Sequence, residues 1–215
     1  MKFKKWKPRT GTQALTIRSR RLELRPVSEA DYEVWTAALA ARLPRQNRFD
    51  PGPKAGSELS RRAFRKALRH WQKGLRLKEC FVFGIFDRAT GANLGTLDLY
   101  VLNRSLRWAN LGYQIHNVYW GQGFASEAAT LALSLAFGPL DFHRVEAGCE
   151  LENLASARVA LRAGLVEEGI RRKFLPQGES GTDLRMFGIN AIDFRTKKRK
   201  SDINAPLRRR EEKVR

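Results

Sequence analysis

The chain has 215 residues, of which 42% are hydrophobic, 10% aromatic and 29% charged. That length suits one well-packed domain, and that composition excludes a wholly disordered chain. No apolar run approaches the roughly 20 residues that cross a bilayer, and no apolar stretch follows the basic N-terminus as in a secretory signal. Two cysteines, Cys80 and Cys149, are too few for a disulfide framework or a four-ligand zinc site. We therefore expect a cytoplasmic protein without a metal or a membrane.

The excess of basic residues points to a polyanionic partner. Lysine and arginine number 41 against 22 acidic residues, which gives a formal net charge of +19. Residues 1–9 carry a net +5 and residues 195–215 a net +7, so +7 remains for the residues between them. A field of this sign attracts nucleic acid, ribosomes and phosphorylated cofactors. The two ends are therefore either solvated tails or tethers to RNA or the ribosome.

The first part of the chain predicts a strand followed by two helices. Residues 21–25 alternate polar and apolar side chains as a half-buried strand does, and Ser28 with Asp31 forms an N-cap pattern for a helix over 29–42. A loop rich in proline and glycine precedes a second helix at 58–75. The polar face of that helix is either solvated or a contact for RNA or a cofactor phosphate. It carries Arg61, Arg62, Arg65, Lys66, Arg69 and Lys73.

The pattern then changes to strands. Short apolar runs bounded by turn residues predict an antiparallel meander, and a glycine-containing turn leads from it into an apolar helix. A strand, a short helix and a final strand pair complete the pattern, so the fold class is α+β. The elements expected here are strands 80–86, 94–102, 107–116, 144–151, 165–175 and 182–190, and helices 127–137 and 153–163. We expect one domain over residues 17–194, between basic tails at 1–16 and 195–215.

The turn at residues 121–126, Gly-Gln-Gly-Phe-Ala-Ser, is the segment to which we assign chemistry. Small residues let a ligand approach the backbone N–H groups of the helix's first turn, where the helix dipole adds partial positive charge. A diphosphate fits such a cradle. The turn is not a Walker A loop, because no Gly-Lys-Ser/Thr follows, and it lacks the third glycine of a dinucleotide fingerprint. Taken alone, it is equally compatible with a tight turn from strand to helix.

The ordered set of motifs resembles the GNAT N-acetyltransferases. That family carries Gln/Arg-x-x-Gly-x-Gly/Ala at the start of a helix, and this chain matches it at Gly123 and Ala125 but has Trp120 at the first position. Tryptophan is usual there in the RimJ/RimL branch, which acetylates the N-termini of ribosomal proteins. The other segments similar to that branch are 21–26, 83–87, 94–95, 111–115, 143–145, 153–156 and 161–169.

This resemblance implies a GNAT fold: a mixed, mostly antiparallel central sheet with flanking helices, whose fourth and fifth strands splay apart to bind acetyl-CoA (CoA). It implies that pantetheine pairs with the backbone of residues 115–118 and that the diphosphate lies on N–H groups of residues 122–126. Arg158, with Arg162 one turn later, is either surface charge or an anchor for the adenosine-side phosphate. The expected cofactor-binding residues are Ile115, His116, Asn117, Val118, Gln122, Gly123, Phe124, Ala125, Ser126, Asn153 and Arg158.

The resemblance also implies direct attack of a neutral amine on the thioester, with catalytic groups nearby. Ser156, at the Asn-x-x-Ser position, is the expected proton donor to the CoA thiolate. Glu150 is our candidate for the general base, and Glu152, Asp98 and His116 are its alternatives. Both cysteines are expected to be buried thiols, because acetyl transfer in this family has no cysteine intermediate.

We therefore predict an acetyl-CoA-dependent N-acetyltransferase that modifies the N-terminal amine of a protein such as a ribosomal protein, as a monomer or homodimer. One alternative keeps the acetyl-CoA site but has a small amine as acceptor: an aminoglycoside, a polyamine or an amino acid. A polycationic acceptor is disfavoured by a +19 chain unless the cleft is acidic. The other alternative is a catalytically inactive protein that binds nucleic acid or the ribosome, and the intact Gly123 and Ser156 argue against it.

Overall fold

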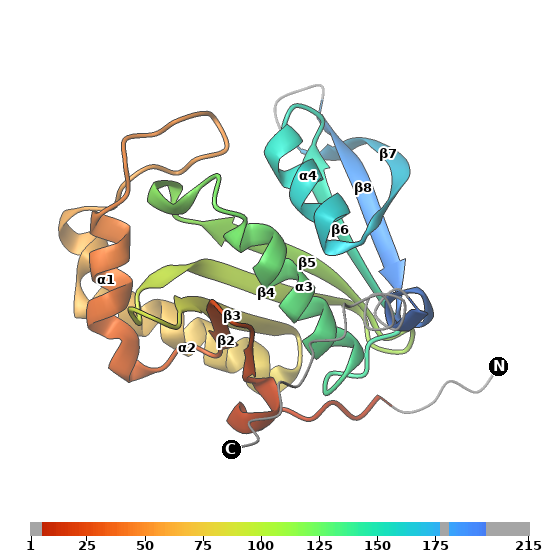
Figure 1. Ribbon diagram of the computed structural model, residues 1–215, viewed down its shortest axis with the longest axis horizontal. Helices are drawn as coiled ribbons and strands as arrows, with labels where there is room; N and C mark the ends of the chain where they lie inside the picture. The colour runs from red at the N-terminus through yellow and green to blue at the C-terminus, as the bar shows by residue number, and fades with distance from the viewer. Residues whose placement is uncertain (1–5, 177–180, 197–215) are drawn as a thin grey trace, which may run out of the picture.

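One eight-stranded sheet organises the protein, in the order β1-β2-β3-β4-β5-β6-β8-β7. The structure is a computed structural model that describes residues 6–176 and 181–196 (Figure 1). The strands are β1 Ile17–Arg18, β2 Leu22–Arg25, β3 Cys80–Asp87, β4 Asn93–Asn103, β5 Trp108–Ile115, β6 Arg144–Glu150, β7 Val166–Leu175 and β8 Thr182–Asn190. The helices are α1 Tyr32–Ala40, α2 Arg61–Leu77, α3 Phe124–Phe137 and α4 Leu154–Ala163, and residues 191–196 are also helical.

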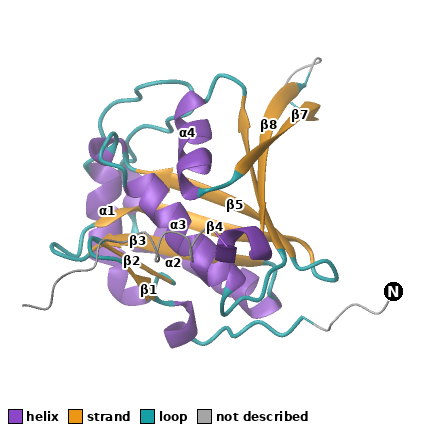
Figure 2. Ribbon diagram, turned by 45° about the vertical axis from the view of Figure 1, so that its right-hand side comes forward, coloured by secondary structure: helices purple, strands orange, loops and turns teal. Residues whose placement is uncertain are grey.

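Helices cover both faces of the sheet (Figures 1 and 2). On β3 and β4, residues of one parity, such as Phe81 and Leu99, are buried in the main core together with the small residues of α3. Residues of the other parity face α1 and α2, because Gly74 of α2 lies against Cys80 and Val27 lies against Gly84. A period of two therefore divides the meander into a face for α3 and a face for α1 and α2.

The sheet opens between β5 and β6. These two strands are parallel and pair only at their first residues, from Trp108 opposite Arg144 to Asn110 opposite Glu146. Beyond that point β6 stays paired with β8 as far as Glu150, whereas β5 continues to Ile115 paired only with β4, and Figure 1 shows β5 and β6 running apart. The splay that the resemblance predicts between the family's fourth and fifth strands is confirmed, and these strands are β5 and β6 here.

The predicted elements are present, with ends displaced by a few residues. The N-cap at Ser28 is confirmed as a capping box with Asp31, although the first turn is 3-10 and α1 begins at Tyr32. The final strand pair is also present, but β8 lies between β6 and β7, so the last strand is inserted rather than added at the edge. Chain order alone does not specify that insertion.

The expected N-terminal tail differs from the structure over its described part. Leu15 is 1% exposed, and the Trp6 indole donates a hydrogen bond of 2.7 Å to the Leu140 carbonyl. Trp6 also packs on Phe142, with ring centroids 5.2 Å apart. Residues 6–16 therefore belong to the packed domain, because their apolar side chains find a place on its core. Residues 1–5 and 197–215 of the expected tails lie outside the described part.

Candidate active site

A cavity of about 440 Å³ lies in the opening of the sheet. Its walls come from the end of β5, the turn before α3, the first turns of α4 and the loop that joins α1 to α2. Eight of the residues that we predicted line it: Ser156, and from the cofactor set Ile115, Gly123, Phe124, Ala125, Ser126, Asn153 and Arg158. The remaining predicted residues lie outside its lining: His116, Asn117, Val118, Gln122 and Glu150.

The glycine turn is built as an anion cradle. Gly123 is the N-cap of α3 and has φ +80°, and Gly121 has φ +79°, a left-handed conformation that glycine adopts without strain. The helix begins at Phe124, three residues earlier than expected, so the N–H groups of residues 124–126 are its first and have no partner within the helix. A Cβ at Gly121 would meet nothing within 4 Å, so the space beside the turn is open.

Arg21 of β2's preceding turn supports the cradle from behind. Its guanidinium forms an ion pair of 2.5 Å with Glu127 in the first turn of α3, and donates to the Gln122 carbonyl at 3.2 Å. It also lies 4.6 Å from the centre of the Phe124 ring. Arg21 begins the segment 21–26 that resembles the family, but nothing in that segment indicates that Arg21 holds the glycine turn in place.

The free edge of β5 reaches only the first residue of the segment 115–118 that we predicted to pair with pantetheine. The His116 N–H donates to the Leu94 carbonyl, and a 3-10 turn follows at once over Asn117–Tyr119. The Ile115 carbonyl is also occupied, because it accepts a 2.8 Å hydrogen bond from the Trp120 indole. The open backbone groups are therefore those of Tyr113 and the Ile115 N–H, which share the side of β5 that pairs with β6.

Tyr113 and Ser156 meet on the cavity wall. The Tyr113 phenol lies 2.8 Å from the Ser156 carbonyl oxygen and 3.0 Å from its Oγ. A phenol has one proton, so if Tyr113 donates to the carbonyl, the Ser156 hydroxyl donates to Tyr113. Burial raises the pKa of Tyr113 to about 12, although the hydrogen bond to Ser156 opposes this, so the phenol keeps its proton at neutral pH. The sequence did not single out Tyr113, which lies at an apolar position of an alternating strand.

The backbone of Ser156 is fixed by the preceding cap. Asn153 is the N-cap of α4, and its side-chain oxygen accepts the Ser156 N–H at 3.1 Å. Cys149 is buried beside this turn, and its Sγ lies 3.7 Å from the Asn153 carbonyl. Burial raises the pKa of the Cys149 thiol, which is the opposite of what a nucleophilic cysteine needs.

A buried polar cluster of Arg42, Asp50, Asn93, His116 and Asn117 ties the α1–α2 loop to the end of β5. Arg42 pairs with Asp50 at 2.6 Å, and both side chains are at most 1% exposed. Asn117 donates to Asp50 at 2.8 Å and bonds Leu43 in both directions. Burial would raise the pKa of Asp50, but hydrogen bonds from backbone N–H groups, Asn117 and Arg42 lower it to about 2. The loop is therefore held in one position over the cavity.

His116 is a member of this cluster and not a base in the cavity. Its Nε2 lies 3.1 Å from Asn93 Oδ1, and its Nδ1 lies 3.5 Å from the Arg42 guanidinium. Burial, and then the charge of Arg42, lower the pKa of His116 to about 4, so the ring is neutral at physiological pH. Arg42 also lines the cavity, and its Nε is buried with no hydrogen-bond partner among the described residues.

The carboxylates that we considered as bases lie outside the cavity lining. Arg48 of the α1–α2 loop pairs with Glu150 at 2.8 Å and with Glu152 at 3.1 Å, so both bridge the cavity mouth. Asp98 lies on the opposite face of the sheet from Tyr113, where burial raises its pKa. Asp and Glu are absent from the described residues that line the cavity.

The cavity fits a ligand that combines an extended polar chain with phosphates. Arg158 and Arg162 lie one turn apart on α4 at its edge, and neither is within ion-pair distance of a carboxylate in the described part of the chain. Together with the open N–H groups of α3, they supply donors for negative charge. In residues 6–176 and 181–196, no group of three His, Cys, Asp or Glu side chains could hold a metal. No helix in those residues is long and apolar enough to cross a membrane.

Comparison with known proteins identifies the family. Residues 21–166 match the model of the acetyltransferase (GNAT) domain. A probable N-acetyltransferase of Bacillus subtilis, YjcK, is 37% identical over 110 residues, which are 51% of this chain and 61% of that protein. An uncharacterized N-acetyltransferase of the same organism, YoaA, is 32% identical over 57% of this chain and 66% of its own. The chain thus spans about three-fifths of the length of these relatives.

Solved structures agree on the fold. RimJ of Mycobacterium smegmatis in complex with a CoA disulfide superposes with a TM-score of 0.64 at 22% identity, over 83% of this chain and 90% of that one. A chimera of the spermidine N-acetyltransferase from Vibrio cholerae gives a TM-score of 0.62 at 20% identity, over 80% of this chain and 97% of that one. At such identities the likeness shows the fold and not the acceptor. The family match and the splayed, glycine-capped cavity together establish that this chain belongs to the GNAT acetyltransferase family, whose acetyl donor is acetyl-CoA.

Proposed function

We propose that the protein transfers the acetyl group of acetyl-CoA to the N-terminal amine of a protein, a ribosomal protein being one acceptor of this kind. One observation carries the choice of acceptor: the described residues that line the cavity include three arginines and no carboxylate. A polyamine or aminoglycoside needs acidic partners for its several positive charges. A protein N-terminus brings one amine, and its backbone carbonyls are acceptors for buried donors such as the Arg42 Nε.

The absence of a carboxylate from the lining also fits the acidity of this acceptor. An α-amino group has a pKa of about 7.7–8.0, whereas the side-chain amine of lysine has a pKa of about 10.4. At pH 7 roughly a tenth of an N-terminal amine is already neutral, and neutral amine is the attacking species. A side-chain amine of high pKa would need a strong base in the cavity, and we propose no such base here.

Binding and proton transfer divide between the two arms of the cavity. Bound acetyl-CoA supplies the acetyl group as an activated thioester. We assign the diphosphate to the N–H groups of residues 123–126 and the adenosine-side phosphate to Arg158. Ser156 holds a proton for the departing thiolate, and Tyr113 orients the Ser156 hydroxyl through the 3.0 Å contact. Both residues line the same cavity, which supports this assignment.

Glu150 is proposed as a positioning residue and no longer as the base. Its ion pair with Arg48 joins the end of β6 to the α1–α2 loop across the mouth of the cavity. If this role is right, Glu150→Gln raises the KM for the acceptor a few-fold and leaves kcat within about threefold. If Glu150 were the general base, the same substitution would instead lower kcat by about 10²-fold or more.

Acetylation assays with defined acceptors test the proposal. The purified protein is given acetyl-CoA with a short peptide, with the same peptide blocked at its N-terminus, and with spermidine. We expect turnover of the free peptide, none of the blocked peptide, and a kcat/KM for spermidine at least 100-fold lower. Below the pKa of the peptide amine, kcat/KM should fall about tenfold per pH unit, since the neutral fraction does. Faster turnover of spermidine contradicts the choice of acceptor. Binding of acetyl-CoA without turnover of any amine contradicts catalysis.

A further inference from the structure

The outer face of α2 is strongly basic. Helix α2 spans Arg61–Leu77 and carries seven lysine and arginine residues and no aspartate or glutamate. Its inner face is apolar and buried, with Phe64 at 0% and Leu68 at 5% exposure. The helix lies on the face of the sheet opposite α3, behind the strands in Figure 1, and contributes no residue to the cavity. A role in holding a CoA phosphate is therefore excluded for this face.

Five of these side chains form one straight row along the helix. They follow one another at intervals of four, three, four and three residues, which is the spacing of neighbours on one helical face. At 1.5 Å per residue, the row is about 21 Å long. All five residues are exposed. We call this set the α2 basic row: Arg62, Lys66, Arg69, Lys73 and Arg76.

The row has no internal counter-charge. Glu29 and Glu33, at the start of α1, pair with Arg61 and Arg65 on the neighbouring part of the helix. No member of the α2 basic row lies within ion-pair distance of a carboxylate in the described residues. The five positive charges therefore face solvent together.

This arrangement is unfavourable for the helix itself. Like charges three and four residues apart destabilise a helix by about 0.2–0.5 kcal/mol per pair. Arginines in the first turn also oppose the positive end of the helix dipole, where acidic residues are favoured. Glutamate or glutamine at the same exposed positions would keep the helix and remove the repulsion. The pattern thus fits a binding face better than a structural surface.

We propose that the α2 basic row binds the phosphate backbone of a nucleic acid duplex, independently of the acetyl-transfer site. A row of lysines and arginines about 21 Å long presents charges at the scale of successive backbone phosphates. The exposed face offers no large aromatic ring on which unpaired bases could stack: Phe64 is buried, Trp71 packs into the apolar cluster with Val27, and the imidazole of His70 is the one exposed ring of α2. Backbone contact, and not recognition of single-stranded bases, is what these side chains can make.

A membrane surface is a poorer fit for the same helix. An interfacial helix inserts its apolar face into the lipid, and the apolar face of α2 is already buried against Val27, Tyr32 and Trp35. Leu77 is the exposed large apolar side chain of α2. The row therefore has charge to offer and almost no apolar surface.

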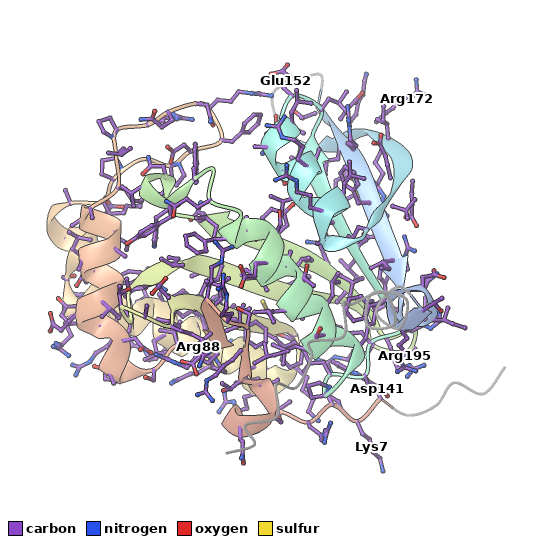
Figure 3. All side chains as sticks on the ribbon, viewed as in Figure 1. Lys7, Arg88, Asp141, Glu152, Arg172 and Arg195 are labelled. Atoms are coloured by element: carbon purple, nitrogen blue, oxygen red, sulfur yellow. The ribbon has the colours of Figure 1, made fainter. Side chains whose placement is uncertain are left out.

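The test measures duplex binding by the full chain with two matched variants. The row variant combines Lys66→Gln, Arg69→Gln and Lys73→Gln. The control combines Lys7→Gln, Arg20→Gln and Arg172→Gln, which removes the same charge at exposed positions outside α2; Figure 3 labels Lys7 and Arg172. Fluorescence anisotropy with a 20-base-pair RNA and a DNA duplex of the same sequence gives Kd from low to moderate salt, and a difference between the duplexes identifies the better fit.

We expect the row variant to bind at least tenfold more weakly than the native chain at about 0.1 M salt. The slope of log K against log salt should fall by about two, since each lost phosphate contact contributes about 0.7–0.9. The control should change Kd less than threefold. Because repulsion is removed, the row variant should unfold at the same temperature as the native chain or higher, which shows that its loss of binding is not misfolding.

Three outcomes overturn the proposal. If both variants weaken binding equally, only net charge matters. If single-stranded RNA binds more tightly than either duplex, the row does not select duplex backbone. The third outcome is that phosphatidylserine vesicles bind the native chain but not the row variant, and that duplex RNA does not displace them. The row would then be a membrane contact.

Discussion

Tyr113 and Ser156 connect the two arms of the opened sheet, one from β5 and the other from α4. Their oxygens are 3.0 Å apart, on either side of the opening that begins where β5 and β6 separate beyond Asn110. The contact places a protonated phenol next to the hydroxyl that we assign as proton donor. His116, which the sequence offered as an alternative base, serves the fold, because its ring nitrogens lie beside Arg42 and Asn93.

Replacing either oxygen of this pair should lower turnover more than cofactor affinity. We expect Ser156→Ala to reduce kcat by about 10²-fold, the usual size of one acid–base contribution, and Tyr113→Phe to reduce it by about tenfold. The Kd for acetyl-CoA should change less than threefold in both. Steady-state kinetics and calorimetric titration measure the two quantities. Native kcat in Ser156→Ala would show that the hydroxyl has only a structural role.

His116 should make the stability of the fold sensitive to mild acid. Its folded pKa of about 4 lies below the 6.5 of an unperturbed histidine, so the unfolded chain binds the extra proton. The stability that neutral His116 contributes is therefore fully present above pH 6.5 and is lost as the pH falls towards 4. At pH 4.5 the free energy of unfolding should be lower by roughly 2 kcal/mol. Urea unfolding at pH 7 and 4.5 measures this loss. The loss should be smaller in His116→Gln, and an equal loss in both proteins would assign it to other groups.

At the scale of secondary structure, the site depends on where β5 ends and where α3 begins. Strand β5 stops at Ile115 and α3 starts at Phe124, so a short segment with two left-handed glycines sets the helix N-terminus against the cavity. Trp120 closes this segment onto β5 through its indole N–H. The tryptophan that replaces the family's usual Gln or Arg thereby has a structural role of its own.

Gly123→Ala tests whether the left-handed cap matters for the cofactor. Forcing alanine into that conformation costs about 1–2 kcal/mol, which binding must overcome if the cradle holds the diphosphate. We expect the Kd for acetyl-CoA to rise about tenfold. Gly91→Ala is the matched control, because Gly91 has φ +73° and lies in the β3–β4 turn. A Cβ would meet nothing within 4 Å at Gly91 and Arg21 Nη2 at the ordinary contact distance of 3.7 Å at Gly123. It should lose similar stability and no affinity. Equal affinities in the two variants would remove the cradle from the site.

At the scale of the whole molecule, distant segments complete the domain around the cavity. The α1–α2 loop is fixed to β5 by Asn117, 74 residues from Leu43, and reaches across the mouth to β6 through Arg48. At the other side, the segment from Trp6 closes the core between β3 and Phe142. The α2 basic row lies on the face of the sheet opposite α3 and contributes no residue to the cavity, so the acetyl-transfer cavity and the proposed nucleic acid contact are separate surfaces.

Trp6 should contribute to global stability although it precedes the family match. Its ring is partly buried and its indole N–H is hydrogen-bonded, so Trp6→Ala should lower the free energy of unfolding by about 2 kcal/mol. Lys7→Ala, at the adjacent exposed position, should change it by less than about 0.5 kcal/mol. Chemical denaturation of both variants checks this. If Trp6→Ala unfolds with the same free energy as the native chain, residues 6–16 do not contribute to the packed domain.

The sequence by itself determined the order of the elements, the glycine turn and the family, because these rest on local periodicity and short motifs. It also placed Ser156 and Gly123 correctly on the cavity. It could not reveal Tyr113 as a partner of Ser156, since an aromatic residue on a strand indicates core packing until its neighbour is known. Nor could it show that Arg48 binds Glu150 or that Arg42, Asp50 and His116 are buried together. Those contacts join residues far apart in the chain, and only the tertiary structure decides which buried charges meet.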